Sequence, residues 1–135
     1  MKKENVKKVI GYWQKTAKRD YDTMLGLFKI KRYPESLFYG HIVLEKILKA
    51  LVVKHTEKEA PYIHDLLRLR EISETDLSEE QIDLLDTVND FNIRARYPER
   101  KLQFYKKCDR EYVKDYLDKI IKLYKELCQK LKQKK

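Results

Sequence analysis

The sequence predicts an all-α protein, an antiparallel up-and-down four-helix bundle with one additional short helix. Only 3 of the 135 residues are glycine and 3 are proline, so the chain has few turn formers and should lie mostly in regular elements. The helix formers Lys, Leu and Glu are abundant. Long helices with short connections pack most simply as an antiparallel bundle. We expect a single domain, residues 1–135, with its core at about 5–130.

Two long helices are expected in the N-terminal part of the chain. In residues 5–31, apolar side chains recur at spacings of three and four, which indicates one buried face. Residues 35–55 follow Pro34, which suits the first turn of a helix. This second segment is apolar nearly all round, so it should lie at the centre of the bundle or at a subunit contact.

The rest of the chain should form a short helix, two longer helices and a linking segment. Ser78 and Gln81 have the spacing of a capping box, which marks a helix start. Pro98 favours an end to that helix just before it. The expected elements are a short helix at 64–71, a helix at 79–96, a loop or broken helix at 97–108, and a last helix at 109–132.

Charge is unevenly distributed along the chain, whose formal net charge is +9. Residues 1–32 hold ten Lys or Arg against three acidic residues, and residues 106–135 hold eleven against five. Residues 71–90 hold eight acidic residues and no Lys or Arg. The basic terminal helices could pair with this acidic segment, within a chain or across a dimer. Solubility and attraction to nucleic acid are equally good interpretations of the net charge.

Several classes of protein are disfavoured by the sequence. Cys108 and Cys128 stand apart, without the clustered spacing of a zinc site or a disulfide framework. The first 15 residues lack the apolar run of a signal peptide, and no stretch approaches the roughly 20 apolar residues of a membrane span. We expect a soluble, reduced, cytoplasmic protein with no membrane association, no metal and no cofactor.

A polar stripe interrupts the apolar helix expected at 35–55. His41, Glu45 and Lys49 are four residues apart and therefore share one face. Glu45 and Lys49 have the spacing of an ion pair. The simpler interpretation places this stripe on the solvent side of the helix. The functional alternative places it in a groove between helices or subunits.

His64 and Asp65 stand at the start of the short helix. Asp65 is best interpreted as a cap of that helix. His64 could reach a neighbouring helix, although a lone histidine is more often a hydrogen-bonded structural residue than a ligand or base. The three histidines lack the paired spacing of a zinc motif.

The stretch RARYP gathers Arg94, Arg96 and Tyr97 before Pro98. Cations in the last turn of a helix are stabilised by the helix dipole, which explains the stretch as a helix C-terminus. Guanidinium groups also match phosphate or carboxylate as planar forks. Two arginines and a tyrosine would therefore make an anion or nucleotide site, and the structural interpretation is favoured about two to one on chemistry alone.

Three segments in this order, YPESLFYGHIVLEKILKALVV, IHDLLRL and IRARYP, resemble the HEPN domain family (higher eukaryotes and prokaryotes nucleotide-binding). They are most similar to its small prokaryotic branch, whose fourth helix ends in Ala-Arg-Tyr-Pro. The resemblance covers about residues 5–130. It implies a bundle of four to five helices, usually a homodimer, whose gene often lies beside that of a minimal nucleotidyltransferase in a toxin–antitoxin-like pair.

Many HEPN proteins are metal-independent ribonucleases, and the resemblance departs from them at one point. Their motif has a histidine four to six residues after an arginine, whereas here no histidine follows His64. Histidine would be the natural general base for a ribose 2′-hydroxyl. The resemblance therefore implies the fold, the dimer and the partner but no catalytic residue. It maps nucleotide binding onto Arg94, Arg96 and Tyr97, with His64 and Lys49 as neighbours.

Three functions compete on this basis. The first is a homodimeric, non-catalytic binding module that partners a minimal nucleotidyltransferase and binds a nucleotide or another phosphate ligand. The alternative is a divergent metal-independent ribonuclease toxin that cuts RNA across the dimer groove. The third is an electrostatic RNA-binding protein, disfavoured because most tyrosines fall on predicted core faces and few would be free to stack on bases.

Overall fold

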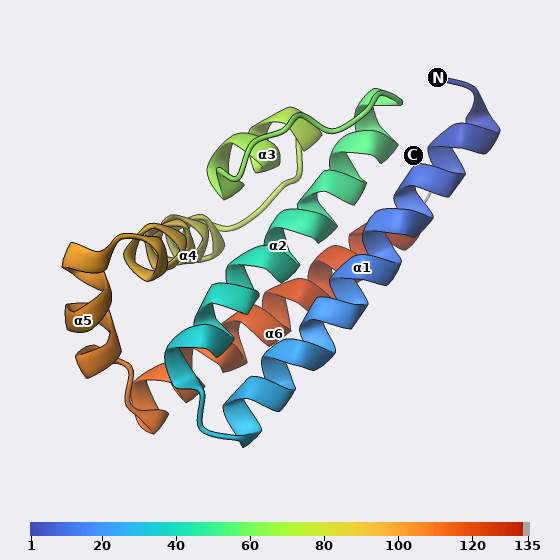
Figure 1. Cartoon of the computed structure of the whole chain (residues 1–135). Coiled ribbons are helices and arrows are strands. Elements are labelled where there is room, and N and C mark those ends of the chain that lie inside the picture. Colours follow the sequence, from blue (N-terminus) through green and yellow to red (C-terminus); the bar gives the residue numbers. More distant parts are fainter. Residues whose placement is uncertain (134–135) are drawn as a thin grey trace.

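The computed structural model describes residues 1–133, apart from the side chains of 95, 98 and 99, and this part of the chain is a bundle of helices, as predicted. The elements are α1 (Lys3–Lys29), α2 (Tyr33–Thr56), α3 (Leu66–Ser73), α4 (Glu79–Arg96), α5 (Pro98–Lys107) and α6 (Arg110–Lys132). Helices α1, α2 and α6 lie side by side, with α1 antiparallel to the other two (Figure 1). Helix α4 is inclined to these three and is seen nearly end-on, and α3, α4 and α5 lie on one side of them.

Helix α2 lies at the centre of the bundle, which confirms the central position expected for this apolar helix. It packs against α1, α3, α4 and α6. Its apolar residues from Leu37 to Val53 are mostly buried. A helix that is apolar nearly all round requires neighbours on several sides, and here the other helices provide them.

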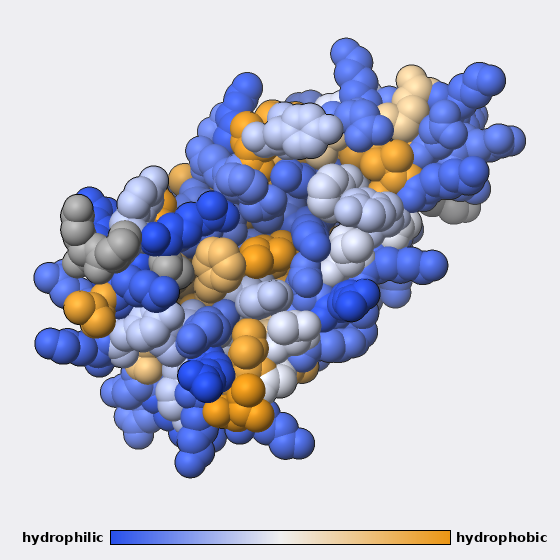
Figure 2. Space-filling view, viewed as in Figure 1, coloured by the Kyte–Doolittle hydropathy of each residue, from blue (hydrophilic) through white to orange (hydrophobic). Residues whose placement is uncertain are grey.

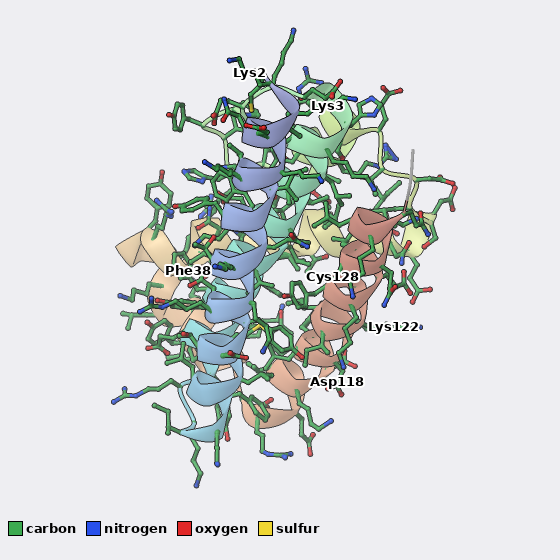
Figure 3. All side chains as sticks on the ribbon, turned by 90° about the vertical axis from the view of Figure 1, so that its right-hand side faces the viewer. Lys2, Lys3, Phe38, Asp118, Lys122 and Cys128 are labelled. Atoms are coloured by element: carbon green, nitrogen blue, oxygen red, sulfur yellow. The ribbon has the colours of Figure 1, made fainter. Side chains whose placement is uncertain are left out.

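Close packing at Gly40 brings α1, α2 and α6 together. A Cβ atom at this position would lie 2.8 Å from Ile120 Cδ1 and 3.6 Å from Met24 Sδ. Further along, the rings of Tyr21 and Tyr124 stack with their centroids 4.8 Å apart. Figure 3, turned by 90°, shows α1 and α6 lengthwise beside each other, with side chains of both helices in the space between them.

Local signals set the helix starts as expected. Ser78 accepts a hydrogen bond from the Gln81 amide, and the Gln81 side chain accepts one from the Ser78 amide, which completes the capping box. Asp65 accepts hydrogen bonds from the amides of Leu67 and Arg68 at the start of α3. Its predicted capping role is confirmed.

The prediction of a loop or broken helix at 97–108 was wrong, because residues 98–107 form the continuous helix α5. Tyr97 is extended (φ −96°, ψ 122°), as expected of a residue before proline, and it separates α4 from α5. The same proline then stands in the first turn of α5, where its missing N–H costs nothing. Phe104 anchors α5, since it is buried and its ring centroid lies 5.6 Å from that of Phe91 on α4.

The surface is predominantly hydrophilic, with small separate apolar areas on the face shown in Figure 2. Among the side chains described, no ion pair joins residues 71–90 to α1 or α6. The expected pairing of the acidic segment with the terminal helices is therefore not made within the described part of one chain. None of the described helices is long and apolar enough to cross a membrane.

Candidate functional site

The polar stripe of α2 forms a network with the loop before α3. We call His41, Glu45, Lys49 and His64 the α2 polar network. Lys49 Nζ donates to Glu45 Oε2 at 3.0 Å, and His64 Nδ1 lies 3.0 Å from Glu45 Oε1. His41 Nε2 lies 2.9 Å from the backbone oxygen of His64, and its Nδ1 is 3.7 Å from Glu45 Oε1. Glu45 thus joins three cationic or titratable side chains.

Burial of the three α2 members of this network, His41, Glu45 and Lys49, contradicts the solvent-side interpretation of the stripe. His41 is 1% exposed and Lys49 is 5% exposed. The ammonium of Lys49 also lies 5.3 Å from the centroid of the Trp13 ring on α1. Burial lowers the pKa of His41 from its usual value, and this effect exceeds the opposing attraction of the Glu45 carboxylate.

An acidic groove lies beside the α2 polar network, between α4 and the start of α3. It has a volume of about 500 Å³, and His41 and His64 line it together with Asp65, Asn89 and Asp90. Asn89 accepts a hydrogen bond from the Leu66 amide and donates one to Asp65 Oδ1, both at 2.9 Å. The groove's polar groups are therefore used in part to hold the start of α3 against α4.

A second, cationic pocket lies where α4 meets α5, and we call it the α4–α5 pocket. It has a volume of about 340 Å³, and its lining residues are Asp90, Arg94, Arg100, Gln103, Phe104 and Lys107. Arg94 Nε lies 2.9 Å from Asp90 Oδ2. Arg100, Gln103, Phe104 and Lys107 are spaced so that they share one face of α5. Three cations and one carboxylate thus converge on a pocket whose apolar part is Phe104.

The RARYP residues diverge in the structure. Arg94 lines the α4–α5 pocket, whereas Arg96 Nε donates to Asn92 Oδ1 at 3.0 Å and its guanidinium carbon lies 5.8 Å from the Phe38 ring centroid. Tyr97 is 58% exposed. Residues two apart on a helix point in different directions, which explains why the two arginines do not share a pocket.

The five residues predicted to bind a ligand are therefore distributed over separate places. His64 and Lys49 meet at Glu45, and Arg94 lies in the α4–α5 pocket. The grouping of Arg100, Gln103 and Lys107 with Arg94 was not predicted. Their spacing of three, four and seven would have indicated it, had residues 98–107 been interpreted as a helix.

Cys108 is buried, and its surroundings do not activate the thiol. Burial raises the pKa of the Cys108 thiol to about 12, so it stays protonated near neutral pH and is a poor nucleophile. The nearby Arg94 guanidinium opposes this shift without reversing it. Within the described part of the chain, no group of three or more His, Cys, Asp or Glu side chains is arranged to hold a metal ion.

The protein is a small helical bundle. Its central helix, α2, is apolar on nearly all sides, and a cationic pocket lies where α4 meets α5. The family model described as the HEPN domain matches residues 10–133. The chain belongs to the HEPN domain family, which supports a role related to nucleotides or RNA in general. No curated protein and no solved structure matches the chain.

Proposed function

We propose that this protein is a homodimeric, non-catalytic HEPN binding module that contacts a nucleotide or another phosphate ligand and partners a minimal nucleotidyltransferase in a toxin–antitoxin-like pair. Family membership supports the general nucleotide or RNA role. The dimer and the nucleotidyltransferase partner go beyond this general role. They are proposed because the sequence resembles the small prokaryotic branch of the family.

The observation that carries the ligand class is a concentration of cations on several faces of α5 and at the start of α6. We call it the α5 ridge, and it consists of Arg100, Lys101, Lys106, Lys107 and Arg110. Among the side chains described, none of the five makes an ion pair with a carboxylate. Cations left without carboxylate partners can meet phosphate groups without first breaking an ion pair.

Aromatic rings accompany this ridge. Tyr97 is exposed, and Tyr105 is 37% exposed with Lys101 Nζ 5.5 Å from its ring centroid. An exposed ring beside a cation can stack on a nucleobase while the cation meets the phosphate. This arrangement supports a nucleotide or RNA ligand over a simple acidic peptide.

The placement of His64 disfavours a ribonuclease site built from His64 and Arg94 of the same chain. His64 hydrogen-bonds Glu45 and lines the acidic groove, whereas Arg94 lines the α4–α5 pocket. A general base and a phosphate-binding cation have to meet at one scissile bond. Within one chain these two side chains serve different cavities.

One experiment, in which the purified protein is mixed with total RNA in EDTA, tests both the proposed ligand and the proposed lack of catalytic activity. We expect binding that weakens steeply as salt concentration rises, with no cleavage. Metal-independent cleavage that disappears in an Arg94→Ala/Arg96→Ala variant would overturn the non-catalytic assignment. Absence of any nucleotide or RNA binding at low salt would overturn the ligand class.

The partner and the dimer require a separate measurement. We expect a tagged copy of the protein to co-purify with a co-expressed minimal nucleotidyltransferase encoded beside it. Light scattering coupled to size-exclusion chromatography should give the mass of two chains for the protein alone. A monomer that leaves the nucleotidyltransferase in the unbound fraction would refute this part of the proposal.

A further inference from the structure

We propose that the α4–α5 pocket binds a phosphate monoester, the terminal phosphate of a nucleotide or of an RNA end, in preference to a phosphodiester. This inference rests on the proposed nucleotide or RNA role and names the chemical group that the site selects. The residues assigned to it are Arg94, Arg100, Gln103 and Lys107, with Asp90 as the countercharge.

The first argument is charge matching. Among the described side chains that line the pocket, Arg94, Arg100 and Lys107 bring three positive charges and Asp90 brings one negative charge, so their formal net charge is three minus one, or +2. A phosphate monoester carries about −1.5 to −2 charges at pH 7, because its second pKa is about 6. An internal phosphodiester carries a single negative charge. A phosphate monoester therefore neutralises the charge of such a site almost completely, whereas a phosphodiester neutralises only part of it.

The second argument is the geometry of the donors. Arg94 approaches from α4, while Arg100 and Lys107 approach from the first and last turns of α5. The Asp90 carboxylate contacts Arg94 at Nε and so orients its guanidinium. Gln103 adds an amide between the two α5 cations. Donors from two helices can surround a tetrahedral group with three free oxygens, whereas a diester has only two.

Among the described side chains, the other carboxylates near Cys108 lie outside the lining of the pocket. Glu35 and Asp109 are close enough to act on Cys108, yet neither lines the pocket. Phe104 supplies an apolar wall that is 1% exposed. Charge–charge interactions strengthen where water is displaced by such a wall.

Three adenosine compounds test the preference directly. Adenosine 5′-monophosphate, adenosine 3′,5′-cyclic monophosphate and adenosine share the base and the ribose and differ in the phosphate group. By calorimetry at pH 7.5, we expect the monophosphate to bind on the order of tenfold tighter than the cyclic diester, because it adds a charge-assisted contact. Adenosine should bind more weakly than either.

Two double variants separate the pocket from general attraction. Arg100→Gln/Lys107→Gln removes two cations from the pocket, and Lys122→Gln/Lys125→Gln removes two from α6, outside both the pocket and the α5 ridge. Both pairs change the net charge equally, and all four positions are exposed, so folding should be retained and is verified by circular dichroism. We expect the monoester preference to disappear in the first variant alone.

The source of the phosphate is distinguished with two RNA oligonucleotides of one sequence, one bearing a 5′-phosphate and one a 5′-hydroxyl. Preference for the phosphorylated RNA, with weak binding of the mononucleotide, supports an RNA end as the ligand. Tight binding of the mononucleotide without such an RNA preference supports a free nucleotide.

Two results would overturn the inference. In the first, the monophosphate and the cyclic diester bind equally, or both double variants lose binding to the same degree; the pocket then has no selectivity, and general nucleotide binding stands. In the second, none of the compounds or RNAs binds, and the proposed function fails together with the inference.

Discussion

The ammonium of Lys49 is a buried charge whose position depends on one carboxylate. Its side chain is 6% exposed, and that of its partner Glu45 is 12% exposed. Removal of one member of a buried ion pair is costly because the other remains in a poorly solvated place. Here His64 stays beside Glu45 and relieves part of this cost.

We therefore expect Lys49→Met to lower the free energy of unfolding by about 2–3 kcal/mol, slightly less than is typical for a broken buried pair. Urea unfolding followed by circular dichroism measures the change. Lys18→Met is the matched control, because Lys18 and Asp22 have the same spacing but are 61% and 60% exposed. The control should change stability by less than about 0.5 kcal/mol, and equal losses in both variants would refute the argument.

The lowered pKa of His41 predicts how stability depends on pH. The unfolded chain takes up a proton near pH 6.5, while the folded chain resists protonation of this buried ring. As pH falls from 7.5 through 6.5, the unfolded state binds more protons and becomes favoured, so stability decreases. The slope from one such group is at most about 1.4 kcal/mol per pH unit.

Urea unfolding between pH 5.5 and 8 tests this prediction. His41→Gln keeps a hydrogen-bonding side chain and should flatten the slope that the wild type shows over this range. His55→Gln, at an exposed histidine, serves as the control and should retain that slope. An unchanged slope in His41→Gln would assign the pH dependence to other groups.

At the scale of elements, two glycines in helices have opposite environments. A Cβ at Gly11 on α1 would meet nothing within 4 Å, whereas at Gly40 it would meet Ile120 Cδ1 at 2.8 Å. Gly11→Ala should raise stability by about 0.5–1 kcal/mol through helix propensity. Gly40→Ala should lower it, because overpacking a core costs about 1–3 kcal/mol.

A double-mutant cycle checks the cause at Gly40. Ile120→Val removes the Cδ1 atom that the new methyl group would approach. In this background Gly40→Ala should cost less than it does in the wild type, as measured by urea unfolding. Additive effects of the two substitutions would show that the close approach of α2 and α6 does not set the penalty.

Local and non-local signals explain which elements and sites were predictable. The starts of α3 and α4 depend on Asp65 and Ser78, whose capping hydrogen bonds lie within three residues along the chain, so sequence alone sufficed to predict these caps. Helix α5 was missed because Pro98 was interpreted only as a terminator. Burial of Lys49 depends on how α1 packs beside it, and the proximity of Arg94 to Lys107 depends on how α5 packs against α4. No local sequence pattern predicts how these helices pack.

At the scale of the whole molecule, positive charge is concentrated on cations that make no ion pair with a described carboxylate. The formal net charge is +9, and the α5 ridge contributes five cations without carboxylate partners among the described side chains. Repulsion between these cations destabilises the compact folded state, and salt weakens that repulsion by screening the charges.

Lys101→Gln/Lys106→Gln should therefore raise the Tm by about 2–4 °C at low ionic strength, the shift expected for roughly 0.5–1 kcal/mol. The difference should vanish near 1 M salt, where the screening length is about 3 Å. Lys114→Gln/Lys119→Gln removes the same charge from residues paired with Asp118 and Asp115 and should give no gain. A gain in both variants at low salt would implicate net charge alone and not its location.

The contact between Lys49 and the Trp13 ring gives the molecule a built-in optical reporter. Trp13 is the single tryptophan, and it lies where α1 docks against α2. Its fluorescence therefore follows the attachment of one helix, whereas circular dichroism follows all of them. Coincident unfolding curves would mean that α1 separates with the rest of the bundle, and an earlier fluorescence change would identify α1 as the first helix to leave.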